Sequence, residues 1–234
     1  IRSHITPHDR LAQKMRVYDR NQQDSYQMNR EDNSSVYSNQ SSIHGDLAKL
    51  VQKHMTSSWQ EPTPPHDREA MRKILVLLKA HDGPLILDSF CGTGMSTAKL
   101  ASQNPKALVI GIDKSADRLR RHEQTQSHNY HLIRGNCEHI WAQLVAANVE
   151  CEQHYLLYPN PWPKKAHLKR RIHGHPSFPL LKQLGGAIEV RSNWKIYVDE
   201  FAAAAQLLGL DTQVKSLSAT DPMTLFERKY AANR

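Results

Sequence analysis

Hydrophobic positions along the chain fall into short runs that alternate with segments of helical periodicity. The apolar runs of strand length are 84–87, 107–112, 130–133, 155–157 and 187–190. Helical patterns occupy 67–79, with Asp67 as the expected N-cap, and then 94–102, 115–122, 138–147, 176–184 and 194–208. Strands separated by helices need crossover connections, so the pattern predicts an α/β fold with a mostly parallel sheet covered on both faces.

The first part of the chain has a different composition. Residues 1–42 are rich in Asn, Gln, Ser, Asp and Arg, and their apolar residues are too sparse to build a core. We expect little fixed structure there, followed by one helix over 45–55. Because prolines break the pattern at 62–65, we predict a polar arm over 1–65 and a main domain over 66–234.

Composition favours a polyanionic partner. The 31 Lys and Arg residues against 23 Asp and Glu give a formal net charge of +8. The three cysteines form no C-x-x-C pair, which fits a reducing cytoplasm and suggests no metal site. Apolar stretches are too short to span a membrane, so we expect a cytoplasmic monomer or homodimer.

Candidate chemistry begins where the first apolar run ends. Asp88 starts the sequence Asp-Ser-Phe-Cys-Gly-Thr-Gly, whose Gly92 and Gly94 lead directly into a helical segment. Glycines there let the chain turn tightly and let a ligand approach the backbone. The next run ends in Asp113, where the ribose of a nucleotide would lie. This pattern has three interpretations: a structural turn with a capping Asp113, a dinucleotide site, and the cofactor site of a methyltransferase.

The acid at position 88 distinguishes between these ligands. A carboxylate beside the glycines repels a pyrophosphate but attracts a cofactor that carries an ammonium group, which favours S-adenosylmethionine. After the third run, the side chain of Asn136 and the adjoining amide of Cys137 are placed to contact adenine. A simple turn at Asn136 explains the same residues equally well.

The most specific stretch is Leu-Tyr-Pro-Asn-Pro-Trp-Pro-Lys-Lys-Ala-His-Leu-Lys-Arg-Arg at 157–171. It resembles the signature of the tRNA guanine-N7 methyltransferases, and the similarity continues through 184–186, 192–194 and Thr-Leu-Phe-Glu at 224–227. The resemblance implies a class I, Rossmann-like fold with a seven-stranded sheet. It also implies S-adenosylmethionine as cofactor and a guanine in the variable loop of tRNA as target.

Carried over position by position, the resemblance assigns roles to particular residues. Those implied for the cofactor are Asp88, Gly92, Gly94, Asp113, Asn136 and Cys137; those implied for catalysis are Asn160, His167, Asn193 and Glu227; those implied for the RNA are Lys164, Arg170, Arg171 and Thr224. Guanine N7 loses no proton on methylation, so placement of the base matters more than a general base. Trp162 either stacks on a base or packs under its own loop.

Departures from the family pattern concern the expected active site. Asn160 and Asn193 stand where the family has Asp, Phe90 where it has Gly, and Ala166 where it has Arg. An amide offers guanine a weaker acceptor than a carboxylate does. Two other readings therefore stay open: a methyltransferase acting on an exocyclic or side-chain amine through the Asn-Pro-Trp loop, and a catalytically impaired RNA-binding relative. A contribution of the N-terminal arm to partner contacts is a further possibility.

Overall fold

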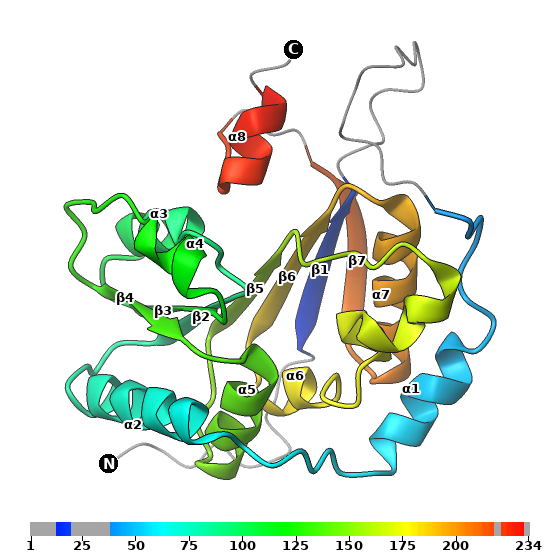
Figure 1. Cartoon of the computed structure of the whole chain (residues 1–234), viewed down its shortest axis with the longest axis horizontal. Coiled ribbons are helices and arrows are strands. Elements are labelled where there is room, and N and C mark those ends of the chain that lie inside the picture. Colours follow the sequence, from blue (N-terminus) through cyan, green and yellow to red (C-terminus); the bar gives the residue numbers. More distant parts are fainter. Residues whose placement is uncertain (1–12, 20–37, 218–220, 232–234) are drawn as a thin grey trace.

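The computed structural model describes residues 13–19, 38–217 and 221–231. Within them, seven strands form one sheet in the order β4-β3-β2-β5-β6-β1-β7 (Figure 1). The strands are β1 (Lys14–Asp19), β2 (Leu85–Ser89), β3 (Leu108–Asp113), β4 (Tyr130–Arg134), β5 (Gln153–Leu157), β6 (Ala187–Ser192) and β7 (Asp211–Ser216). All neighbouring strands pair in parallel, so their carboxyl ends lie along one edge of the sheet.

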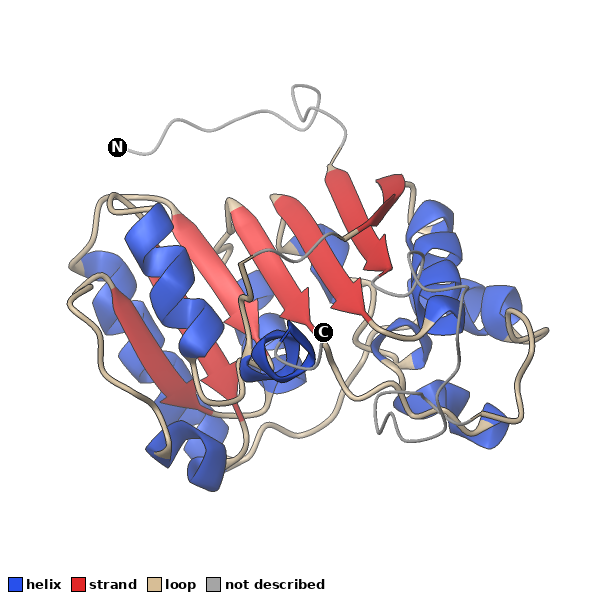
Figure 2. Ribbon diagram, turned by 90° about the horizontal axis from the view of Figure 1, so that it is seen from above, coloured by secondary structure: helices blue, strands red, loops and turns tan. Residues whose placement is uncertain are grey.

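Helices pack against both faces of this sheet (Figure 2). One face carries α1 (Leu47–Met55), α2 (Pro65–Lys79), α5 (Cys137–Ala146), α6 (Leu180–Gln183) and α7 (Lys195–Leu207), whose apolar residues share the larger core. The other face carries α3 (Met95–Gln103) over a smaller core. Two shorter helices, α4 (Ala116–Arg120) and α8 (Leu225–Ala231), follow β3 and β7, and two 3-10 helices span Lys165–Arg170 and Ile172–Gly174.

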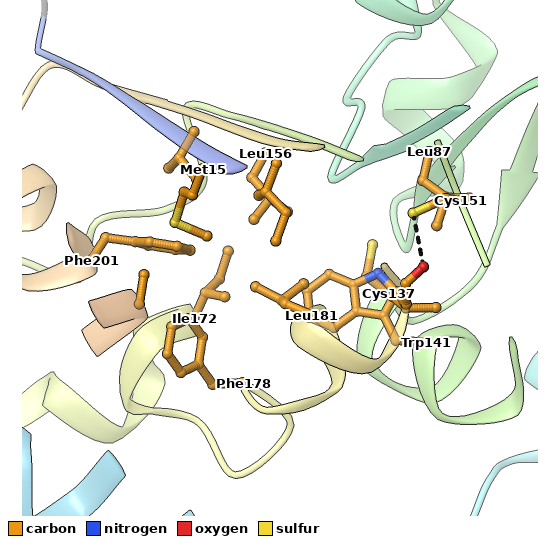
Figure 3. Close-up of a cluster of buried hydrophobic side chains, with 14 of the residues drawn as sticks. Met15, Leu87, Cys137, Trp141, Cys151, Leu156, Ile172, Phe178, Leu181 and Phe201 are labelled. Atoms are coloured by element: carbon orange, nitrogen blue, oxygen red, sulfur yellow. Dashed lines mark hydrogen bonds between the residues drawn. The ribbon is translucent and has the colours of Figure 1, made fainter. Parts of the chain in front are cut away.

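Burial along each strand follows from how many of its faces are covered. All residues of β2 and β3 are buried, which explains their continuous apolar runs. In β1 and β6 buried and more exposed positions alternate, because only one of their faces packs on helices. Met15 of β1 projects toward Phe201 of α7 and Ile172 in the larger core (Figure 3).

The N-terminal strand corrects the expectation that residues 1–42 have little fixed structure. β1 lies inside the sheet, where Met15 pairs with Ile188 of β6 on one side and with Thr212 of β7 on the other. Residues 38–42 also have defined positions, whereas 1–12 and 20–37 lie outside the described residues. The sheet is therefore built from segments on both sides of the predicted boundary at 62–65.

The start of α2 also differs from its prediction. The helix begins at Pro65, with Pro64 as N-cap, and Asp67 is inside the first turn. Proline suits the first helical position because it has no N–H to satisfy. Asp67 is fully buried and its carboxylate accepts hydrogen bonds from the Asn136 N–H (2.9 Å) and from Nδ1 of His139 (2.6 Å). The acid predicted to cap its own helix thus anchors the segment that follows β4.

Candidate functional site

The loop after β2 turns sharply before α3 begins. Phe90, Gly92 and Gly94 all have positive φ angles, of 62°, 63° and 79°. A Cβ atom added to Gly92 would meet no heavy atom within 4 Å, so open space adjoins the backbone there. At Gly94 an added Cβ would lie 2.6 Å from the side chain of Leu132. The two glycines therefore serve different needs: access to the backbone at the first and close packing at the second.

Asp88 is buried at the end of β2 and only half of its carboxylate is satisfied. Oδ2 accepts hydrogen bonds from the hydroxyls of Ser96 and Thr97, each at 2.6 Å. Oδ1 is buried and has no hydrogen-bond partner among the described residues. Burial raises the pKa of Asp88 to about 6, although the hydrogen bonds from the two hydroxyls act in the opposite direction. A buried acceptor without a donor is costly, and a cationic ammonium group would satisfy it.

Asp113 ends β3, the strand next to β2, and it is also buried. Its Oδ2 accepts a hydrogen bond from the Gly92 N–H (3.0 Å) and its Oδ1 accepts one from the Ser115 N–H (2.8 Å). Arg118 forms an ion pair with it at 3.1 Å. An ionised carboxylate has about four acceptor positions, so these contacts leave capacity for a ribose hydroxyl. The two acids lie on adjacent strand ends, as the sequence predicted, while the ribose contact itself stays a prediction.

Asn136 caps α5, which supports the simpler of its two explanations. Its side-chain Oδ1 accepts a hydrogen bond from the His139 N–H at 3.2 Å. Cys137 is buried, and its thiol accepts a hydrogen bond from the Phe90 N–H at 3.3 Å. The ring of Phe90 packs edge-on against Trp141. The segment after β4 is thereby tied to the glycine loop, and contacts of Asn136 and Cys137 with adenine stay predictions.

The loop after β5, residues 158–164, is the candidate substrate loop. Tyr158 and Trp162 have φ angles of 52° and 47°, in the left-handed region that non-glycine residues rarely adopt. Asn160 is exposed, and its side-chain carbonyl accepts a hydrogen bond from the Trp162 N–H at 3.2 Å. Asn160 therefore stabilises the turn of its own loop, as asparagine often does in tight turns.

Trp162 is half-buried between two residues of the following 3-10 helix. The guanidinium of Arg170 lies 5.0 Å from its ring centre, and the ring of His167 meets it edge-on at 5.6 Å. Partial burial lowers the pKa of His167, and the positive charges of Arg170 and Lys164 lower it further. Packing under the loop thus accounts for Trp162, and both His167 and Arg170 are held beside it.

Arg171 belongs to the basic run 164–171 and was implied for the RNA by the family resemblance, but the structure buries it. Its side chain is fully buried and forms an ion pair with Glu200 of α7, and its guanidinium lies 4.8 Å from the centre of the Trp194 ring. Lys164, Lys165, Lys169 and Arg170, by contrast, are exposed. A guanidinium that is enclosed by protein cannot reach an RNA backbone, so the exposed members of the cluster are the candidates for that contact.

The Thr224 to Glu227 segment forms the start of α8. The Glu227 N–H donates to the Thr224 hydroxyl (3.1 Å), and the Glu227 carboxylate accepts from the N–H of Met223, the residue before Thr224. Glu227 is buried and also pairs with Arg191 of β6 at 2.9 Å. These contacts show that Glu227 fixes the start of α8. An additional role of Glu227 in orienting the base stays a prediction.

Helix α8 lies next to the substrate loop. The ring of Phe226 packs on that of Tyr158 with centres 4.6 Å apart. Asn193 is half-buried just after β6, whose Arg191 backbone carbonyl accepts from the Tyr158 N–H at 2.9 Å. The structure thus brings the segments of Asn160, Asn193 and Glu227 to one end of the sheet, and their catalytic roles stay predictions.

A pocket of about 350 Å³ opens between α3, residues 121–127 and α8. Thr93 of the glycine loop lines it, together with Met95, His122 and Leu225. Asp88, Asp113 and Asn136 do not line it, so this pocket is distinct from the group of residues predicted to hold the cofactor.

Two other features were searched for within the described part of the chain. None of its helices has the length and apolar character needed to cross a membrane. Residues 13–19, 38–217 and 221–231 contain no group of three or more His, Cys, Asp or Glu side chains able to hold a metal ion.

Sequence analysis missed several residues that shape this site. Ser96 and Thr97 donate to Asp88, Asp67 holds the Asn136 backbone, and Glu200 pairs with Arg171. Serine and threonine in the first turn of a helix after an acidic strand end give a usable signal for the first pair. Nothing in the local sequence links residue 67 to 136 or residue 171 to 200, because both contacts depend on the tertiary fold.

Comparison with known proteins identifies the family. A family model described as "Putative methyltransferase" (Methyltransf_4) matches residues 82–233. The chain belongs to this methyltransferase family. This match and the seven-stranded parallel sheet confirm the methyltransferase family, the fold class and the S-adenosylmethionine cofactor that the sequence predicted.

Curated relatives agree with this assignment. The chain is 28% identical over 163 residues to the tRNA (guanine-N(7)-)-methyltransferase of Mycobacterium tuberculosis (strain ATCC 25618 / H37Rv), and the match covers 63% of this chain and 62% of the relative. It is 28% identical over 157 residues to the enzyme of that name from Treponema pallidum (strain Nichols), with coverages of 62% and 61%. The matched region thus spans less than two thirds of these relatives.

Among solved structures, an antibiotic related methyltransferase matches with a TM-score of 0.41 and 14% identity, over 66% of this chain and 77% of the other. The 16S rRNA (adenine(1408)-N(1))-methyltransferase W203A mutant matches with a TM-score of 0.37 and 16% identity, over 51% and 60%.

Proposed function

We propose that this chain transfers a methyl group from S-adenosylmethionine to N7 of a guanine in tRNA. When bound, the cofactor supplies an electrophilic methyl group on a sulfonium centre. The single observation that carries the proposal is the position of the substrate loop and of the basic 3-10 helix after it: β5 pairs with β2, so they lie beside the acid-lined glycine loop at one edge of the sheet. The names of the curated relatives support the choice of tRNA as substrate.

The residues fit the cofactor in three respects. Asp88 presents a buried oxygen that lacks a donor, which suits the ammonium group of a methionine moiety. Open space adjoins the backbone at Gly92, and Asp113 lies on the next strand with acceptor capacity for ribose. On this proposal Asp88 binds the cationic end, Gly92 admits the cofactor and Asp113 orients its sugar.

The acceptor base needs placement more than proton removal. N7 of guanine carries a lone pair and loses no proton, so the protein must hold it in line with the methyl group. Asn160, next to the strained Trp162, stands on the loop that would meet the base. The exposed cations Lys164, Lys169 and Arg170 would bind phosphates of the RNA backbone.

Methyl transfer to bulk tRNA, followed by nucleoside mass spectrometry, tests this function. Formation of 7-methylguanosine supports it, whereas an N-methylated amine would favour the amine-directed alternative. If S-adenosylhomocysteine binds in a calorimeter and no tRNA is methylated, the proposal is wrong for the natural chain. Gain of activity by Asn160→Asp would then identify a catalytically impaired relative.

The RNA contact is tested separately with Lys164→Ala. Loss of one phosphate contact should reduce the slope of log affinity against log salt by about 0.7 to 0.9. Lys79→Ala removes an exposed lysine at the end of α2 and serves as the matched control. Equal slopes for the two variants would exclude Lys164 from the RNA-binding surface.

A further inference from the structure

The substrate loop is held by buried groups from outside its own segment. Arg171 donates from Nε and Nη2 to the carbonyl of Trp162, both at 3.2 Å, and from Nη2 to the carbonyl of Lys164 at 3.4 Å. Left-handed conformations at non-glycine residues cost free energy and persist only where the surroundings enforce them. The buried guanidinium of Arg171 is one such constraint on Trp162.

Residues 38–44, which precede α1, supply a second constraint. The Ser38 hydroxyl donates to the carbonyl of Pro163 at 2.6 Å, and the Asn39 side-chain oxygen accepts from the Lys165 N–H at 3.2 Å. Consecutive backbone groups from Trp162 to Lys165 are thus bonded either to Arg171 or to this segment.

Gln40 joins the two constraints. Its side chain is 8% exposed; its Nε2 donates to Oε1 of Glu200 at 2.6 Å, and its Oε1 accepts from Nη2 of Arg171 at 3.0 Å. Glu200 also accepts from the His44 N–H (2.9 Å) and from Nε2 of His173 (2.9 Å). Burial alone would raise the pKa of Glu200. The hydrogen bond from His173 and the other donors have the larger effect and lower the pKa to about 2. A carboxylate that stays ionised keeps Arg171 in place.

We propose that residues 38–44 brace the substrate loop and that Gln40 is a positioning residue for methyl transfer, acting through Arg171 on the backbone beside Asn160. On this proposal residues 38–44 take part in placing the acceptor base. The expected effect of Gln40 on turnover rests on the proposed function. The contacts by which residues 38–44 brace the loop do not depend on it.

The test compares Gln40→Met with wild type. Methionine has nearly the same length and removes both hydrogen-bonding groups, whereas Glu200→Gln would weaken a buried ion pair and endanger folding. Gln52→Met, at an exposed position of α1, is the matched control. Hydrogen–deuterium exchange of peptides from 158–171 and from 85–113 reports on the two loops separately.

We expect amide exchange in 158–171 to rise tenfold or more in Gln40→Met, because the variant loses its hydrogen bonds to both Glu200 and Arg171 and one bond to a charged group already corresponds to about tenfold. Exchange in 85–113 and affinity for S-adenosylhomocysteine should stay at the wild-type values. With tRNA as acceptor, kcat should fall by about 10- to 100-fold, as expected for a misplaced reactant. Gln52→Met should match wild type in each measurement.

Unchanged exchange in 158–171 would overturn the brace, and so would a rise of equal size in 85–113, which would indicate general loosening. Unchanged kcat despite faster local exchange would overturn the positioning role. If wild type methylates no tRNA, the proposed function fails, and the exchange experiment still decides whether the brace exists.

Discussion

Cofactor affinity should depend on pH through Asp88. Its pKa is raised to about 6 by burial, and the ionised form is the one that attracts an ammonium group. Because of this raised pKa, Asp88 of the folded, cofactor-free protein stays protonated until the pH passes about 6. Affinity should therefore increase as pH rises through this value. At pH 5 about a tenth of the molecules are ionised, so the Kd should be about tenfold higher than at pH 7.

Calorimetric titration with S-adenosylhomocysteine at pH 5, 6 and 7 measures this dependence. Asp88→Asn removes the titrating group while keeping its shape, so its weaker binding should not vary with pH. Asp82→Asn, an exposed acid in the turn before β2, should behave like wild type. A Kd for wild type that is constant from pH 5 to 7, or a tenfold change that persists in Asp88→Asn, would refute the role of Asp88.

Three further predictions concern buried polar groups. Thr97→Val removes a donor that lowers the Asp88 pKa, so the inflection in cofactor affinity should move to higher pH in the same titration. Burial lowers the pKa of His154 to about 3, so its contribution to stability is fully present above pH 6.5 and is lost as the pH falls; between pH 7 and 5 wild type should lose about 2 kcal/mol more than His154→Gln in urea denaturation. Arg171→Met removes the guanidinium that pairs with the buried Glu200 carboxylate and should cost about 3–5 kcal/mol in the same assay, whereas a loss below about 1 kcal/mol would contradict a buried ion pair.

Sequence patterns located β2 to β6, and they were clearest for the strands that are covered on both faces. β2 and β3 are covered on both faces, so their apolar runs marked them as strands. The strand β1 carries only a short alternating pattern in a polar context, and its partners are far away in the sequence. β7 lies at the sheet edge and is mostly exposed, so burial imposed no apolar run on it. Both were missed because long-range pairing, rather than local composition, makes them strands.

The candidate site shows the same division. Asp88 and Asp113 could be placed together because parallel strands on either side of a helix end at the same edge. The resemblance implied an RNA contact for Arg171, and the sequence alone does not show which members of a run of cations face water and which face protein. Only the fold shows that the last of them turns inward to Glu200, while Arg170 stays outside.

The insertion of β1 between β6 and β7 has a consequence for synthesis of the chain. β1 leaves the ribosome early, but both edges it must join are translated much later. Until β7 has emerged, the backbone groups along one edge of β1 stay unpaired, and contacts so distant in sequence form slowly. Nascent chains should therefore acquire protease resistance in one late step, after Ser216 has cleared the exit tunnel, and they should depend on chaperones before it.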